Sequence, residues 1–136
     1  MSKEQLYIFD TTLRDGAQTQ GVDFSIDDKE KISSALDKLG VDYVEGGWPG
    51  ANPTDTEFFN KDHNFKTTKL TAFGMTKKSE HSAENDPMLS SLINSKSTSV
   101  CLFGKSWDFQ VDVALGISNE QNLMNISEST KHIVKS

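Results

Sequence analysis

The sequence predicts an α/β fold with a parallel sheet, built from four βα units. Four strand-length apolar segments start at residues 6, 41, 70 and 99, so the intervals between them are 35, 29 and 29 residues. A βα unit takes about 30 residues. The first and last segments are nearly continuous apolar runs, which are typical of parallel strands buried on both faces. The four expected strands are residues 6–9, 41–44, 70–73 and 99–103.

Helix signals occupy the interval after the first strand. Ser25 is a suitable N-cap with Asp28 at the N3 position, and Gly40 is a suitable residue just beyond the helix end. The apolar residues between them recur at helical spacing, which predicts an amphipathic helix. We expect its buried face to consist of Ile26, Ile32, Ala35, Leu36 and Leu39.

The next two intervals between expected strands carry a different signal for the start of a helix. Asn52-Pro53 and Asp86-Pro87 each place a capping side chain before a proline at the first helical position. The second of these helices should bury Leu89, Leu92 and Ile93. After the last strand, residues 118–121 fit a capping box. The final helix should then bury Leu123, Ile126, Ile133 and Val134.

Two architectures fit four βα units: a small, open, doubly wound sheet or part of a TIM (β/α)8 barrel. Eight units need about 250 residues, and this chain has 136. The last expected helix coincides with the end of the chain, where a fifth strand would be due. Half of such a barrel therefore accounts for the full length of this chain.

Composition excludes several classes of function. The chain carries 14 Lys+Arg against 20 Asp+Glu, a net charge of −6, and it has no basic run. We therefore expect no nucleic-acid partner. We also expect no membrane association, because no apolar segment approaches the length of a span. Cys101 is the single cysteine, which excludes an internal disulfide and indicates a reducing, cytoplasmic location.

Polar residues of useful chemistry follow the first strand. Arg14 can donate a forked pair of hydrogen bonds to a carboxylate or to a developing oxyanion. Asp15 can bind a hard divalent cation, and Gln18 can donate or accept. Because active sites of parallel α/β folds gather beyond the carboxyl ends of strands, we interpret this segment as a candidate site. A solvated loop with a surface ion pair is the alternative.

Further candidates follow the other strands. Glu45 comes directly after the second strand and should point into the same mouth as Asp15; a capping or turn role is the alternative. Lys105 and Trp107 follow the fourth strand, where they could contact a small acid. Phe73, at the end of the third strand, could wall the same pocket or belong to the core.

The residues Asp-Thr-Thr-Leu-Arg-Asp-Gly-Ala-Gln at positions 10–18 resemble the signature of the metal-dependent, acyl-CoA Claisen-condensing and lyase barrels. These include the citramalate, 2-isopropylmalate and homocitrate synthases. Further segments are similar to the citramalate synthase branch, in order along nearly the whole chain. They are residues 45–50, 52–53, 55–59, 72–74, 86–87 and 103–109.

The resemblance implies a TIM barrel that holds a divalent metal (Mg, Mn or Zn) at its carboxyl face. Asp15 would be a metal ligand, and Arg14 would stabilise the keto or enolate oxygen. Gln18 and Glu45 would help hold the substrate and the hydrogen bonds of the site. The reaction would join the acetyl group of acetyl-CoA to a small-molecule α-keto acid, pyruvate first and 2-ketoisovalerate next.

The chain also departs from the resemblance. The family completes its metal site with a His-x-His motif, and this sequence has none. We therefore expect residues 1–136 to be the incomplete amino-terminal half of a TIM-barrel catalytic domain, from an acyltransferase parent and inactive alone. The alternative is a half-barrel that self-associates through open sheet edges, as a structural or small-acid and metal-binding module.

Overall fold

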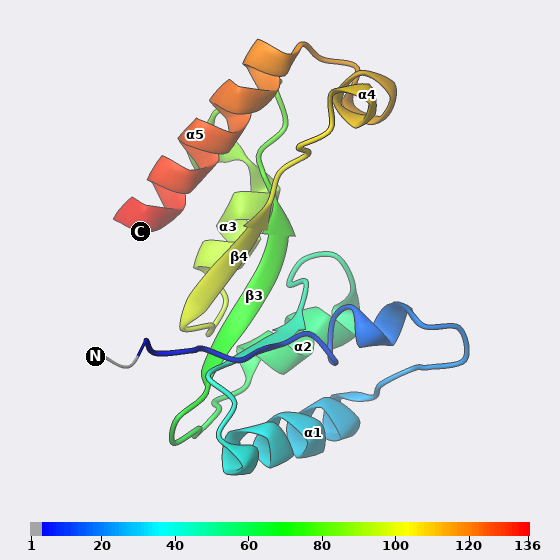
Figure 1. Ribbon diagram of the computed structural model, residues 1–136, viewed down its shortest axis with the longest axis vertical. Helices are drawn as coiled ribbons and strands as arrows, with labels where there is room; N and C mark the ends of the chain where they lie inside the picture. Colours follow the sequence, from blue (N-terminus) through cyan, green and yellow to red (C-terminus); the bar gives the residue numbers. More distant parts are fainter. Residues whose placement is uncertain (1–3) are drawn as a thin grey trace.

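The computed structural model describes residues 4–136 and contains one four-stranded parallel sheet in the order β1-β2-β3-β4 (Figure 1). Helices alternate with the strands, as the sequence predicts. The main elements are β1 (Phe9–Asp10), α1 (Ile26–Leu39), β2 (Tyr43–Gly47), α2 (Pro53–Asn60), β3 (Lys69–Met75), α3 (Pro87–Ile93), β4 (Ser99–Phe103) and α5 (Asn119–Lys135). Short helical turns complete the chain, namely η1 (Gly16–Gln18), η2 (Ala83–Asn85), α4 (Asp108–Gln110) and η3 (Val111–Leu115).

The strand order decides between the two predicted architectures. Each strand pairs with the next one in sequence, so the order never reverses as it does in a doubly wound sheet. A sheet that grows in one direction is how a (β/α)8 barrel is built. The fold is therefore a half-barrel of four βα units. No helix within residues 4–136 is both long and apolar enough to cross a membrane.

The predicted helix caps form with one exception. The Ser25 side chain accepts from the Asp28 N–H and completes a capping box, and Gly40 ends α1 in the left-handed region. Asn52 and Asp86 cap α2 and α3, each with proline at the first turn. Ser118 caps α5 by accepting from the Gln121 N–H, which is one of the two hydrogen bonds of a capping box. The other is missing because the Gln121 side chain donates to Asn125 instead.

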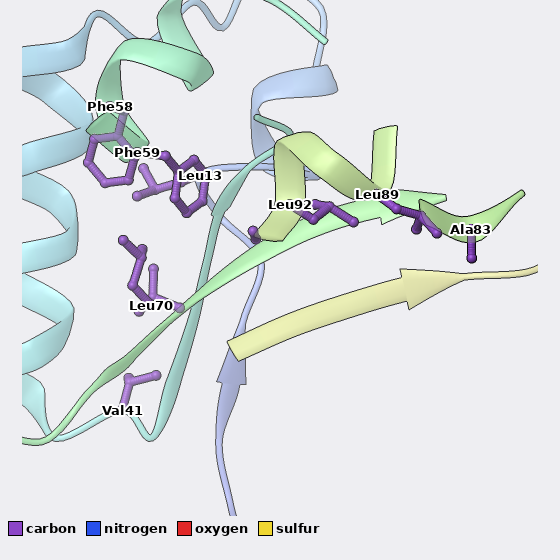
Figure 2. Packing of buried hydrophobic residues seen from close by; sticks show 10 residues of the cluster. Leu13, Val41, Phe58, Phe59, Leu70, Ala83, Leu89 and Leu92 are labelled. Atoms are coloured by element: carbon purple, nitrogen blue, oxygen red, sulfur yellow. The ribbon is translucent and has the colours of Figure 1, made fainter. Parts of the chain in front are cut away.

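The core lies between the sheet and the helices. Phe58 and Phe59 from α2 pack near Leu70 of β3, while Leu89 and Leu92 from α3 pack farther along the same strand (Figure 2). Each of these five side chains is at most 2% exposed. Full burial of an aliphatic or phenyl side chain contributes about 1.5–3 kcal/mol, so this layer holds the helices on one face of the sheet.

The opposite face of the sheet carries two of the predicted site residues, Glu45 and Phe73. Along β3, Leu70 and Ala72 belong to the core, so Thr71 and Phe73 point the other way because strand side chains alternate. Register places Thr71 beside Glu45 and Phe73 beside Cys101. In a closed barrel this face would point toward the barrel interior.

Three predicted strands differ from the expectation. Only Phe9–Asp10 pairs in β1, and the apolar run before it is exposed, with Leu6 at 85% and Ile8 at 60%. The prediction of burial on both faces was wrong here and also for β4, which is half-buried with Phe103 exposed, because an edge strand has one neighbour and little covers it. In β2 the strand begins at Tyr43, so Glu45 lies within it instead of after it.

The predicted buried faces of α1 and α5 were partly wrong. In α1, Lys29 and Ser33 are buried, whereas Leu39 is 78% exposed. In α5 the buried stripe is polar, and Leu123 and Val134 are 65% and 80% exposed. The stripe is polar because it bonds polar groups of the neighbouring loops. Asn122 donates to the Lys105 carbonyl, Asn125 donates to the Ser79 hydroxyl, and the Ser129 hydroxyl accepts from the Lys77 N–H.

Candidate functional site

The loop that follows β1 is an ordered turn. The backbone N–H groups of Arg14, Asp15 and Gly16 all point to the carbonyl of Thr11, at 2.8–3.2 Å. The carboxylate of Asp10 accepts hydrogen bonds from Thr12, which fixes the start of the turn. The turn therefore presents Arg14 toward the neighbouring strand β2.

An ion-pair cluster forms where this turn meets β2. The Nε of Arg14 donates to Oε2 of Glu45 at 2.6 Å, and its Nη1 donates to Oδ1 of Asp15 at 3.1 Å. Glu45 is 1% exposed, whereas the side chain of Asp15 is 61% exposed. Among residues 4–136, Nη2 of Arg14 has no hydrogen-bond partner, so the guanidinium keeps a donor for an anionic ligand.

Aromatic rings support this cluster from the sheet. The guanidinium carbon of Arg14 lies 4.2 Å from the ring centroid of Phe73, a cation–π contact. Trp48 meets Phe73 edge to face at 5.3 Å, and its indole N–H donates to the Met88 sulfur. The Glu45 carboxylate and the Phe73 ring thus hold the guanidinium from two sides, which gives it a defined orientation.

One hollow adjoins the cluster, and a second one meets the first only at Trp48. The first and smaller one, about 250 Å³, is lined by Arg14, Gln18 and Asn52 among others, so the structure brings the predicted residue Gln18 next to Arg14. The second and larger one, about 630 Å³, is lined by Lys105, Lys78 and other residues. Small-molecule sites commonly have volumes of about 300–1,000 Å³.

The predicted residues divide into two groups in the structure. Arg14, Asp15, Glu45 and Phe73 lie together, and Gln18 lines the smaller hollow beside them. The remaining two lie elsewhere. Lys105 lines the larger hollow, with its Nζ 5.3 Å from the Phe103 ring, and Trp107 is 56% exposed, packs on Phe109 and lines neither hollow.

Cys101 lies on β4 beside this cluster. Burial raises the pKa of its thiol, and the charge and hydrogen bonding of Glu45 raise that pKa further, while Arg14 opposes them. The group therefore stays a neutral thiol near pH 7, where a nucleophilic cysteine would need a lowered pKa.

Sequence reasoning missed two residues that hold the site. Lys29 of α1 is 3% exposed and forms an ion pair with Asp55 of α2. Asp55 also accepts from the Trp48 N–H and lies so close to Gly47 that a β-carbon there would be 2.5 Å from its carboxyl carbon. A signal existed: Lys29 sits three residues from both Ile26 and Ile32, on the predicted buried face of its helix.

The described residues do not form a metal centre by themselves. No group of three His, Cys, Asp or Glu side chains converges anywhere in residues 4–136. Asp15 offers one carboxylate, and its Oδ1 already pairs with Arg14. Divalent Mg needs about six ligands, so the donor set present here does not fit a complete site.

Comparison with known proteins identifies the relatives of this arrangement. Residues 5–136 match the family described as HMGL-like. This chain belongs to the HMGL-like family. Its fold agrees: the hydroxymethylglutaryl-CoA lyases of Bacillus subtilis and Pseudomonas aeruginosa superpose with TM-scores of 0.74 and 0.69, at 16% and 17% identity. The matches cover 98% and 96% of this chain and 44% of each lyase chain.

Within the HMGL-like family, the sequence relatives include (R)-citramalate synthases. The protein from Aquifex aeolicus is 48% identical over 132 residues, which cover 96% of this chain and 25% of the relative. The protein from Sulfolobus acidocaldarius is 46% identical over 135 residues, covering 98% and 26%. A 2-isopropylmalate synthase from Caldanaerobacter subterraneus is 32% identical over 133 residues. The chain thus spans about a quarter of the length of the citramalate synthases it matches.

Proposed function

We propose that residues 1–136 supply the amino-terminal half of a TIM-barrel catalytic domain, in an acyltransferase that condenses acetyl-CoA with an α-keto acid. Pyruvate, giving citramalate, is the first candidate for the acid, and 2-ketoisovalerate is the next. The observation that carries the proposal is the Arg14–Glu45 pair on the inward face of the half-barrel. Sequence similarity to the citramalate synthases supports the choice of acid.

Arg14 is the central residue of the proposed chemistry. When the acetyl carbon bonds the keto carbon, negative charge develops on the former carbonyl oxygen, and a fixed cation stabilises it. Glu45 and Phe73 hold the guanidinium in place, so little reorganisation is needed as that charge forms. The buried Glu45 also helps to hold the hydrogen bonds of the site.

The other predicted residues receive binding roles in this proposal. Gln18 contacts the keto acid from the smaller hollow, beside Arg14. Phe73 walls the acid, and Lys105 supplies a cation from the larger hollow. Trp107 would contribute only when further chain covers its exposed ring.

Asp15 is proposed as one oxygen ligand of a divalent metal (Mg, Mn or Zn) in the completed barrel. Its exposed carboxylate is accessible at the mouth, but the remaining ligands must come from outside residues 4–136. The chain alone is therefore expected to be inactive, and its cytoplasmic location remains a prediction.

Self-association through the open sheet edges is proposed as the state of the isolated chain. β1 and β4 each have one neighbour in the sheet, and unpaired edges favour association. A second copy presents the same two edges, so it is the partner most directly available to a purified chain.

A chimera tests the proposed function. Residues 5–136 replace the aligned segment of the Aquifex aeolicus (R)-citramalate synthase, and free thiol released from acetyl-CoA is measured with pyruvate or 2-ketoisovalerate. We expect turnover with pyruvate above that with 2-ketoisovalerate. A chimera that folds but releases no thiol with either acid would contradict the proposal. Preference for 2-ketoisovalerate would support condensation and reject the choice of pyruvate.

A further inference from the structure

Lys29 has an unusual set of contacts for a lysine. Its Nζ donates to the carbonyl of Leu13 at 2.9 Å, to the carbonyl of Gly46 at 2.8 Å and to the carboxylate of Asp55. An ammonium group has three donors, so all three are used. The side chain is 3% exposed.

Two of these acceptors adjoin the candidate site directly. Leu13 immediately precedes Arg14, and Gly46 immediately follows Glu45. One ammonium group therefore bonds the backbone on each side of the Arg14–Glu45 pair, from the helix layer behind the sheet. The contact between Arg14 Nε and Glu45 Oε2, 2.6 Å long, lies on the opposite face of the sheet.

Asp55 completes this arrangement. Its carboxylate balances the buried charge of Lys29 and accepts from the Trp48 N–H at 2.8 Å and from the Asn52 side chain at 2.9 Å. A buried charge without such partners would be strongly destabilising. An apolar residue would fill the same space without the free-energy cost of desolvating two charges, so packing alone does not explain an ion pair at this position.

We propose that Lys29, held by Asp55, is a positioning residue that sets the distance and orientation of Arg14 relative to Glu45. Its importance for catalysis rests on the function proposed above, but the geometric effect does not. A structural role confined to the core would leave the Arg14–Glu45 contact unchanged when Lys29 is replaced without unfolding.

The sequence offers a direct reporter. Arg14 is the only arginine in the chain, so its Nε–H gives a single side-chain signal in a ¹⁵N–¹H NMR spectrum of the full chain. Exchange of that proton with water reports how well the contact to Glu45 is maintained. If the rest of the Lys29→Met spectrum is that of a folded chain, we expect the Arg14 Nε proton to exchange at least about tenfold faster than in the unmodified chain.

Lys61→Met is the matched control. Lys61 also pairs with a carboxylate of α1, Glu30 at 2.8 Å, but on the exposed side. We expect the exchange rate of Arg14 in this variant to equal that of the unmodified chain. Equal acceleration in both variants would overturn the inference, because it would indicate general loosening of α1.

An unchanged Arg14 signal in folded Lys29→Met would also overturn it. If Lys29→Met does not fold, Asp55→Asn decides by the same criterion, because it removes the charge that holds Lys29. Failure of both variants to fold would overturn the inference in favour of a purely structural role. The exchange measurement uses no substrate. An inactive chimera would therefore reject the proposed function but leave the inference about Lys29 unaffected.

Discussion

Arg14 and Glu45, 31 residues apart in sequence, meet through a 2.6 Å contact between Nε and Oε2. Glu45 is almost fully buried, and the guanidinium stacks over Phe73. The contact joins the loop after β1 to strand β2, so it depends on the sheet register and on the loop turn together.

Replacing Glu45 by Gln should lower the pKa of the Cys101 thiol. The Glu45 carboxylate raises that pKa through its charge and a hydrogen bond, in addition to burial, and glutamine removes the charge. Alkylation of Cys101 by iodoacetamide, followed against pH, measures the change, and Cys101 is the only thiol in the chain. Glu57→Gln, an exposed position on α2, is the control, and an equal shift in both variants would contradict the predicted contact.

Asp37 should make the fold sensitive to acid. Backbone N–H groups of Lys66, Thr67 and Thr68 hold the pKa of its carboxyl well below the usual range. A carboxyl with a lowered folded pKa stabilises the fold above its unfolded pKa of about 3.9 and loses that contribution as pH falls below it. Asp37→Asn should therefore lower the urea midpoint at pH 7, with a smaller difference at pH 3.

The control for this effect is Asp112→Asn. Asp112 is exposed, so the urea midpoint of this variant should change little at either pH. A difference for Asp37→Asn that is as large at pH 3 as at pH 7 would show that the loss is not electrostatic.

The isolated chain should release no thiol from acetyl-CoA with pyruvate and Mg²⁺ or Mn²⁺. Residues 4–136 contain no cluster of three metal-ligating side chains, and Asp15 provides only one carboxylate. A colorimetric thiol assay on the purified chain checks this expectation. Turnover that disappears in Asp15→Ala would refute it and show that ligands from the rest of a barrel are dispensable.

The isolated chain should be a dimer or a larger assembly. Leu6, Tyr7 and Ile8 are exposed beside the β1 edge, at 60–85%, and charged residues on an edge strand oppose pairing. Light scattering on Ile8→Lys should show a smaller species than the unmodified chain. A monomeric unmodified chain with a cooperative unfolding transition would contradict self-association.

Local chemistry explains why the helix starts were predictable from sequence. Ser25, Asn52 and Asp86 cap their own helices through hydrogen bonds to N–H groups two or three residues away. The roughly 30-residue spacing of the strands predicted four βα units, and the resemblance to the condensing barrels selected the half-barrel over a doubly wound sheet. The shared carboxyl edge of parallel strands predicted that Asp15 and Glu45 lie close together.

Long-range partners explain what the sequence did not reveal. The three acceptors of Lys29 lie 16, 17 and 26 residues away. The helical pattern places Lys29 on the buried face of α1, but it does not show which groups bind the buried ammonium. The polar stripe of α5 depends in the same way on loop backbone groups that follow β3 and β4. The exposure of the β1 segment depends on how many neighbours the strand has.

The most direct measurement of the central claim is the effect of Arg14→Gln on the chimera with the Aquifex aeolicus synthase. If Arg14 stabilises the oxygen charge that develops during condensation, thiol release with pyruvate should fall by about 10²–10³-fold. Lys61→Gln, which alters only a surface ion pair, should retain the activity of the chimera. A folded Arg14→Gln chimera that is as active as its parent would contradict the proposed role.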